Sequence, residues 1–392
     1  MSPRPDSSVL IECLERQSRQ GFHPGAQLYV SVEGETLIDT AVGRSDGERA
    51  LRPDDVMLWY SSGKPVTTVA VLQLWERGRL SLDDRVERYL PGFGAGKEAA
   101  TIRHLLIHTG GFPMVAAGDP YDMDISDEEA LALIAAHPAE WEPGTRAGYH
   151  PTTSWKVLGA IVERIDGRPI ERYVAEEIFA VSGMADTHLG IDPATRASLG
   201  ERLVPVHWMG HAMPTLGDDG EISLAEYHIE RIHNEPWHAR KVEPGAGMRG
   251  PAHDLGRFYE SLLGFNRPLL DRRTVEAMTA THRTGMPDWT VFCGLKVPWG
   301  LGVQVGAAFG GGVGRRAFGH IGMASSCGLA DPDLGLVAVF VANGLPDPAR
   351  VEERRVALTD GVYSMVGADA SPFRLPPHRP LVNAAASGRT GQ

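Results

Sequence analysis

A serine and a lysine stand three residues apart in Ser61-Ser62-Gly63-Lys64, just before a predicted helix. Positions i and i+3 of a helical turn share one face, so the Ser61 hydroxyl and the Lys64 amine should lie within hydrogen-bonding distance. A serine hydroxyl is a weak nucleophile until a neighbouring base removes its proton. A lysine can be that base when burial and nearby positive charge lower its pKa. The spacing indicates nucleophilic catalysis. The alternative is a helix N-terminus with a capping serine and a solvated lysine.

The rest of the sequence makes this pair stand out. The chain holds only five lysines among its 38 basic residues, and it contains no other S-x-x-K. It also lacks the G-x-S-x-G sequence on which α/β-hydrolases place their nucleophile, so that route to an esterase has no support.

The elements that must position the pair form a simple pattern. Two strands over 26–32 and 36–42 are joined by Glu33-Gly34-Glu35, a hairpin signal, and a helix is expected over 65–77. Between about 100 and 290 the periodicity is mostly helical. Strands return at 300–305, 325–329 and 336–342, followed by a helix over 351–366. This order predicts an α+β fold whose antiparallel sheet is built from both ends of the chain, with a helical lobe inserted.

The same pattern suggests where the domains divide. We expect a discontinuous sheet domain from residues 1–64 and 290–380 and a mostly helical domain from 65–289. Residues 381–392, in a tail rich in Ala, Ser and Gly, are expected to be disordered.

Six collinear segments between about residue 24 and 345 resemble the serine β-lactamase and penicillin-binding-protein-like family. The likeness is strongest to the branch of class C β-lactamases, D-aminopeptidases and family VIII carboxylesterases. The segments are Trp59–Gln73, Gly78–Phe93, Thr101–Pro113, Pro143–Arg164, Pro244–Leu263 and Phe318–Leu329. The resemblance implies a β-lactamase-like fold.

The resemblance also implies catalytic roles. Ser61 would be the acyl-accepting nucleophile and Lys64 its proton partner, with Tyr149 sharing acid and base duty. Since a tyrosine has a pKa near 10, we expect the Lys64 ammonium to stabilise a Tyr149 phenolate. The alternative for Tyr149 is a side chain packed at a loop edge. The main-chain N–H groups of Ser61 and Met323 would form the oxyanion hole.

Substrate contacts are implied for His320, Gly322 and His150. Gly322 lets its strand approach the substrate closely, and the alternative for His320 is a hydrogen-bonded core histidine. The sequence departs from the family pattern at Pro151, where Asn is usual, and at His320, where β-lactamases carry lysine. Both changes weaken a site that must grip the amide and carboxylate of a β-lactam. Family VIII esterases and D-aminopeptidases tolerate such replacements, so the two changes favour these enzymes over a β-lactamase.

Composition excludes several other classes of protein. The 392 residues carry a formal net charge of −12, which argues against nucleic acid or an anionic membrane as partner. Cys13, Cys293 and Cys327 show no disulfide or metal-knuckle spacing. Since no signal peptide or membrane span is recognisable, we expect a cytoplasmic protein.

A segment rich in histidine and tryptophan spans residues 207–238. His207 and His211 are four residues apart, but no Glu lies between them and Gly210 favours a loop, so we expect no metal. Trp208, Tyr227 and Trp237 could form an aromatic loop that shapes substrate choice. A packed surface insertion is the alternative.

Together these observations predict a serine carboxylesterase that cleaves small carboxylic esters through an acyl-enzyme on Ser61, with no cofactor. Alternatives with the same site are an acyltransferase, a D-aminopeptidase and a weak β-lactamase. A non-catalytic binding protein on this fold is the alternative from a different class. The oligomeric state is left open.

Overall fold

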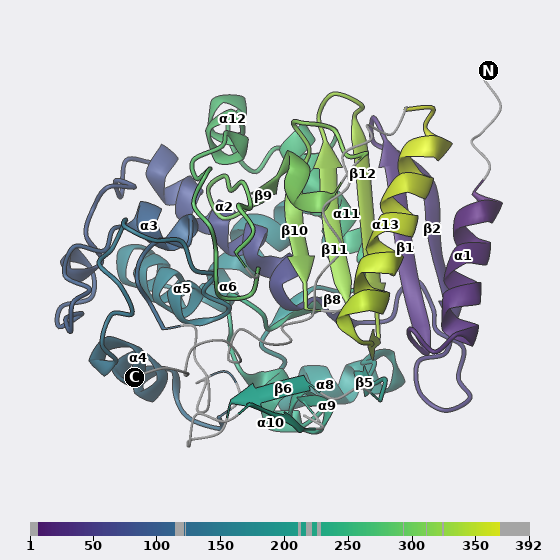
Figure 1. Cartoon of the computed structure of the whole chain (residues 1–392), viewed down its shortest axis with the longest axis horizontal. Coiled ribbons are helices and arrows are strands. Elements are labelled where there is room, and N and C mark those ends of the chain that lie inside the picture. The colour runs from purple at the N-terminus through teal and green to yellow at the C-terminus, as the bar shows by residue number, and fades with distance from the viewer. Residues whose placement is uncertain are drawn as a thin grey trace, which may run out of the picture.

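The computed structural model describes residues 7–113, 121, 123–210, 213–216, 222–225, 229–292, 294–310, 312–323 and 325–368. A six-stranded antiparallel sheet lies on one side and helices fill the other (Figure 1). In sheet order its strands are β2 (Glu35–Gly43), β1 (Gly25–Val32), β12 (Leu336–Ala342), β11 (Ser326–Asp331), β10 (Phe318–Gly322) and β9 (Gln304–Val305). The N-terminal hairpin therefore pairs with strands from the C-terminal part, which confirms the predicted α+β fold.

Both faces of the sheet are covered. Successive side chains of a strand point to opposite faces, and the strands carry apolar side chains on each. In β1, Leu28 and Val30 pack in the cluster that contains Leu10 of α1 (Ser8–Arg19) and Leu358 of α13 (Pro348–Met365). Tyr29, between them, belongs to the larger cluster on the opposite face, where α11 (Ala252–Leu263) lies against β1, β11 and β12. In Figure 1, α13 lies in front of the sheet, α1 lies at its outer edge beside β2, and α11 lies behind it.

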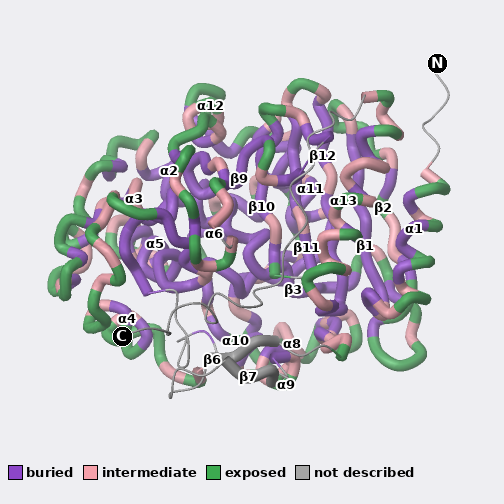
Figure 2. The backbone as a smooth tube through the Cα atoms, viewed as in Figure 1, coloured by how far each residue is buried: buried purple, intermediate pink, exposed green. Residues whose placement is uncertain are grey.

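The larger hydrophobic cluster continues from the sheet into the helical side of the molecule. Figure 2 shows the buried backbone concentrated in the sheet and the helices next to it. The helices of this side are α2 (Lys64–Glu76), α3 (Ile102–Leu106), α4 (Asp127–Ala136), α5 (Thr153–Asp166), α6 (Ile170–Val174), α7 (Ala180–Ser182) and α12 (Arg272–Thr279). Helix α2 is buried from Lys64 to Leu74, so it forms the centre of this core.

Shorter helices and strands complete the fold, and some of them lie along the lower edge in Figure 1. They are α8 (Pro193–Leu199), α9 (Ile229–His233), α10 (Pro236–Arg240), and the strands β3 (Met57–Leu58), β4 (His188–Leu189), β5 (His207–Trp208), β6 (Met213–Leu216), β7 (Ile222–Ala225), β8 (Met248–Gly250) and β13 (Gly344–Leu345). Strand β8 pairs with β3 and β4, and β13 pairs in parallel with β5. The pairing of β3 with β8 places the chain just before Ser61.

Two local differences from the sequence prediction have clear causes. The strand expected over 300–305 is reduced to Gln304–Val305, because the N–H groups of Leu301 and Gly302 bond to the carbonyls of Met278 and Leu106. Helix α1 was not predicted, although its buried residues Leu10, Cys13, Leu14 and Gln17 follow the helical i, i+3, i+4, i+7 pattern. Residues 381–392 lie outside the described residues.

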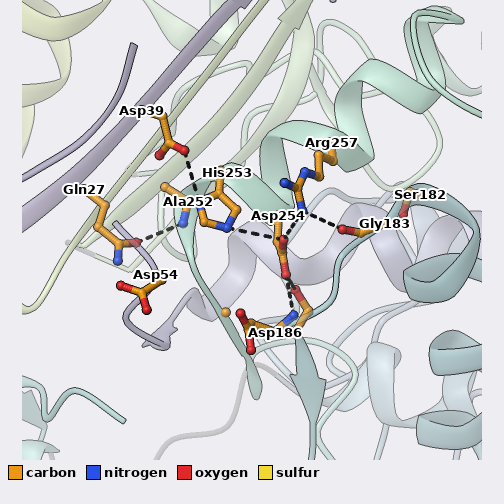
Figure 3. A network of polar contacts seen from close by, with 12 residues as sticks. Gln27, Asp39, Asp54, Ser182, Gly183, Asp186, Ala252, His253, Asp254 and Arg257 are labelled. Atoms are coloured by element: carbon orange, nitrogen blue, oxygen red, sulfur yellow. Dashed lines mark hydrogen bonds and ion pairs between the residues drawn. The ribbon is translucent and has the colours of Figure 1, made fainter. Parts of the chain in front are cut away.

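A polar network around Asp254 ties α11 to the loop before β4 (Figure 3). The buried Asp254 carboxylate accepts hydrogen bonds from the Asp186 N–H and the Thr187 hydroxyl, both at 2.9 Å. Arg257 donates to the same carboxylate at 3.2 Å. Burial raises the pKa of Asp254.

Among the described residues, no helix is long and apolar enough to cross a membrane.

Candidate active site

Ser61 and Lys64 meet at the junction between a short turn and the buried helix α2. Strand β3 leads into the 3-10 turn η1 (Tyr60–Gly63), and α2 begins at Lys64 with Pro65 in its first turn. Lys64 Nζ lies 2.9 Å from Ser61 Oγ, in agreement with the predicted i, i+3 contact. Ser61 is 8% exposed and Lys64 is fully buried, so the amine is removed from bulk water while the hydroxyl keeps some access.

Two main-chain carbonyls hold the lysine in place. Lys64 Nζ donates to the carbonyl oxygens of Pro151 at 2.6 Å and Gly245 at 2.7 Å. Pro151 is the position where the family pattern has Asn. Its main-chain carbonyl contacts the lysine, so the loss of the side-chain amide leaves Lys64 anchored at this position.

Tyr149 completes a triangle with these two residues. Its hydroxyl donates to Ser61 Oγ at 2.8 Å, and its side chain is 6% exposed. Lys64 Nζ lies 5.3 Å from the centre of the Tyr149 ring. Burial raises the pKa of Tyr149, with a further contribution from the negative charge of Asp288. Both effects favour the protonated phenol over the phenolate that we expected the Lys64 ammonium to stabilise.

The main chain around Tyr149 is held by partners that the sequence did not single out as functional. Gly148 N–H donates to the carbonyl of His108 at 3.0 Å, and His150 N–H donates to His108 Nδ1 at 3.1 Å. Tyr149 N–H donates to the Thr290 hydroxyl at 2.8 Å. His108 is itself fully buried, with its ring centre 4.6 Å from that of Tyr149. His108 is thus a direct support of Tyr149.

His150, expected to contact substrate, lies in the interior behind Tyr149. It is fully buried, and its Nδ1 lies 2.7 Å from the Ser154 hydroxyl. Burial lowers the pKa of His150 to about 3, with a contribution from Arg283, so the ring is neutral. The contacts of His150 with His108 and Ser154 support the segment that carries Tyr149.

Strand β10 brings His320 and Gly322 beside the nucleophile turn. The ring of His320 is 1% exposed, and its Nδ1 lies 2.8 Å from the Ile321 carbonyl. A carbonyl only accepts, so Nδ1 carries the proton and Nε2 is the basic nitrogen. Burial and the charge of Lys64 lower the pKa of His320 well below 6.5. The position occupied by lysine in β-lactamases is therefore uncharged at neutral pH.

Gly322 is required by the close approach of β10 to the nucleophile turn. A Cβ atom there would lie 2.1 Å from Ser326 Oγ and 2.4 Å from the Trp59 carbonyl oxygen. We predicted a close approach to substrate at this position, and the contacts found are with the protein's own turn. Met323 follows directly after the strand, and its side chain is 43% exposed.

Tyr60, next to the nucleophile, was missed by the sequence analysis. Its φ of 50° lies in the left-handed region, which is strained for a residue with a bulky side chain. The buried Tyr60 hydroxyl lies 2.9 Å from His233 Nδ1. The sequence carried no signal for this contact, because the two residues are 173 positions apart.

The histidine- and tryptophan-rich segment thus reaches the site through His233. Trp208 packs against the cluster that contains Leu58 and Tyr60, and the ring centres of His233 and His238 lie 4.4 Å apart. His211, Tyr227 and His228 lie outside the residues whose side chains are described. In the described part of the chain, no group of three His, Cys, Asp or Glu side chains is placed to hold a metal ion.

Comparison with known proteins adds independent information. A family model described as Beta-lactamase matches residues 10–361. The chain is 34% identical to Esterase EstB of Burkholderia gladioli over 266 residues, a match that covers 61% of this chain. It covers 65% of that relative, just under two thirds of its length.

Two longer matches cover most of the chain. Esterase/beta-lactamase LipL of Mycobacterium tuberculosis is 24% identical over 380 residues, which is 91% of this chain and 85% of that protein. The crystal structure of a penicillin-binding protein homologue from Caulobacter crescentus superposes with a TM-score of 0.75 and 26% identity. That superposition covers 93% of this chain and 99% of the other.

Proposed function

The chain belongs to the beta-lactamase family, and from this premise we propose that it is a serine hydrolase that cleaves small carboxylic esters through an acyl-enzyme on Ser61. The observation that carries the proposal is the position of Ser61 Oγ, 2.9 Å from Lys64 Nζ and 2.8 Å from the Tyr149 hydroxyl. A nucleophile within hydrogen-bonding distance of a base that is itself oriented by other groups is the arrangement that covalent catalysis requires. The 34% identity to a protein named an esterase supports the ester substrate.

Lys64 is suited to take the proton from Ser61. The carbonyls of Pro151 and Gly245 accept two of its N–H groups. In a neutral amine those two bonds leave the lone pair directed at Ser61 Oγ. When Ser61 Oγ attacks the ester carbonyl carbon, its proton moves to this lone pair and the lysine becomes an ammonium.

The negative charge that develops on the ester oxygen needs donors that are already in place. We assign these to the N–H groups of Ser61 and of Met323, which follows the end of β10 beside η1. Preorganised donors of this kind contribute about 3 kcal/mol each to the stabilisation of a transition state.

The protonated Tyr149 then acts as an acid. Its hydroxyl is hydrogen-bonded to Ser61 Oγ, so it can donate a proton to the departing alkoxide as the C–O bond breaks and recover one from the Lys64 ammonium. Attack of water on the acyl-enzyme reverses this proton path and releases the acid. The neutral His320 offers no fixed positive charge to a substrate carboxylate, which favours neutral esters over β-lactams.

The test is pre-steady-state hydrolysis of p-nitrophenyl acetate with mass spectrometry of the intact protein. We expect a burst of nitrophenol and an added acetyl mass in the wild type, and neither in Ser61→Ala. Ser198→Ala is the matched control, since it removes an exposed serine hydroxyl that bonds to the Thr195 carbonyl and should keep the adduct. Equal background rates and no adduct in any of the three proteins would refute the proposal. Added alcohols that receive the acyl group in place of water would identify an acyltransferase.

A further inference from the structure

A buried ion pair next to Tyr149 has no part in the proton transfers described above. Arg283 is 2% exposed and Asp288 is fully buried, and the closest approach of their charged groups is 3.5 Å, between Arg283 Nη2 and Asp288 Oδ2. Removing two charges from water is costly, so a pair in this position calls for an explanation. Arg283 also donates to the carbonyls of Ile107 at 3.1 Å and His108 at 3.3 Å, and its guanidinium lies 5.2 Å from the ring centre of Trp299.

The ion pair is linked to Tyr149 through a single hydroxyl. Thr290 Oγ donates to Asp288 Oδ1 at 2.5 Å and accepts the N–H of Tyr149 at 2.8 Å. The main-chain N–H of Thr290 binds the same carboxylate oxygen at 3.1 Å. The direction of this chain is fixed, because a carboxylate can only accept and an N–H can only donate.

The segment from Gly148 to His150 depends on such contacts because it is not part of a regular strand or helix. Its three successive N–H groups are bound by the His108 carbonyl, the Thr290 hydroxyl and the His108 ring. Arg283 binds the His108 carbonyl as well. The ion pair therefore holds both supports of this segment, His108 from one side and Thr290 from the other.

We propose that Thr290 and Asp288 are positioning residues for Tyr149, and that the Arg283–Asp288 pair anchors them so that the phenol stays within hydrogen-bonding distance of Ser61. The inference rests on the proposed function, since it assigns no chemistry of its own to these residues. This role explains why the Asp288 carboxylate is buried beside the active site. It also explains why Asp288 is paired with Arg283, which binds the His108 carbonyl on the other side of the Tyr149 segment.

The charge of Asp288 has a second consequence. It disfavours a phenolate nearby and so contributes to the raised pKa of Tyr149. The ionisable side chains that face the Tyr149 ring are Lys64 from α2, His320 from β10 and His108. His150 is the next residue in the chain, and Asp288, paired with Arg283, acts on the Tyr149 hydroxyl through its charge. Burial keeps His108, His150 and His320 neutral. The negative charge near Tyr149 that a substitution in the Arg283–Asp288 pair changes is therefore that of Asp288.

The central variant is Thr290→Val, compared with Thr290→Ser. Valine keeps the shape of threonine and the methyl group beside Gly148, whose Cβ position lies 3.1 Å from that methyl, but it has no hydroxyl. We expect kcat for p-nitrophenyl acetate to fall about tenfold or more in Thr290→Val, with KM changed less than about twofold. Thr290→Ser restores the hydroxyl and should restore most of kcat. Thr281→Val, at an exposed threonine of the same segment, is the control.

The pH profile separates positioning from a loss of fold. Asp288→Asn removes the negative charge, so the pKa of Tyr149 falls and the alkaline loss of kcat/KM should begin at lower pH than in the wild type. Thr290→Val keeps that charge and should lose kcat without this shift. Wild-type kcat in Thr290→Val, or equal impairment of Thr290→Ser, would overturn the inference.

Tyr149→Phe distinguishes the inference from the function on which it rests. A fully active Tyr149→Phe would overturn the role of Tyr149 and the inference with it. An inactive Tyr149→Phe beside a fully active Thr290→Val would overturn the inference alone and leave the proposed function standing.

Discussion

The hydroxyl of Ser62 donates a hydrogen bond to the main-chain carbonyl of His320 at 3.0 Å. This contact joins the nucleophile turn to β10 across 258 positions of sequence. Ser326 of β11 strengthens the junction, because its Oγ lies 2.5 Å from the Trp59 carbonyl oxygen and 2.9 Å from Ser62 Oγ. The residues that would form the oxyanion hole are therefore held by two serines that the family motifs do not identify as catalytic.

Gly322→Ala should separate β10 from the nucleophile turn. The new methyl group would overlap Ser326 Oγ and the Trp59 carbonyl oxygen, at 2.1 Å and 2.4 Å from the Cβ position. We expect a loss of about 1–3 kcal/mol of unfolding free energy from overpacking and a fall of about a hundredfold in kcat/KM from the displaced donors. Urea denaturation and ester kinetics measure both.

Gly94→Ala is the matched control for this prediction, since the nearest atom to its Cβ position is 3.5 Å away. Gly94→Ala should change neither the unfolding free energy nor kcat/KM appreciably. A Gly322→Ala protein with wild-type kinetics would show that the close approach of β10 is unnecessary for the reaction.

Tyr60→Phe tests whether the contact with His233 holds the strained residue beside the nucleophile. The variant loses the 2.9 Å hydrogen bond and keeps the ring. We expect about 1 kcal/mol less unfolding free energy and a lower kcat, because Tyr60 has a φ of 50° that its neighbours must maintain. Tyr89→Phe, which removes a hydroxyl bonded to Asp84 at 2.6 Å, should leave kcat unchanged. Equal kcat values in Tyr60→Phe and Tyr89→Phe would argue against a role of the Tyr60 hydroxyl in positioning the nucleophile.

The protein should lose stability in mild acid through its buried histidines. Burial, with a contribution from Arg354, lowers the pKa of His23 to about 3. The folded state therefore favours the neutral ring. This contribution to stability is present above the unfolded-state pKa of about 6.5 and is lost as the pH falls from there towards 3. At pH 5 the cost is about 2 kcal/mol for a histidine with this pKa.

Urea unfolding at pH 7.5 and pH 5.0 measures this effect. His23→Gln cannot titrate, so its unfolding free energy should fall about 2 kcal/mol less than that of the wild type over this interval. Replacement of the exposed His137 by glutamine serves as control and should keep the wild-type difference. An unchanged pH dependence in His23→Gln would contradict the assignment.

Asp254→Ala should destabilise the fold without changing the chemistry of the site. The variant leaves the Asp186 N–H and the Thr187 hydroxyl without the carboxylate that accepts from both. We expect a loss of about 3 kcal/mol or more. Arg257→Ala removes the exposed partner of the same carboxylate and should cost less than about 1 kcal/mol. Equal losses in the two variants would show that the carboxylate is not the centre of the network.

Local patterns determined much of this protein from sequence alone. The continuous apolar run of β12 supplies side chains to both covered faces of the sheet, because successive side chains of a strand point in opposite directions. The contact of Ser61 with Lys64 followed from their spacing, since a helical turn brings residues three apart onto one face. Such relationships extend over a few residues, and backbone geometry is enough to fix them.

Contacts between distant segments required the tertiary structure. Tyr149 meets Ser61 over 88 positions, and Thr290 supports Tyr149 over 141. The resemblance to a family pointed to Tyr149, but nothing in the sequence indicated Thr290, Asp288 or Tyr60. The protonation state of Tyr149 was also beyond the sequence, because burial and the charge of Asp288 set it and both depend on how the chain is packed.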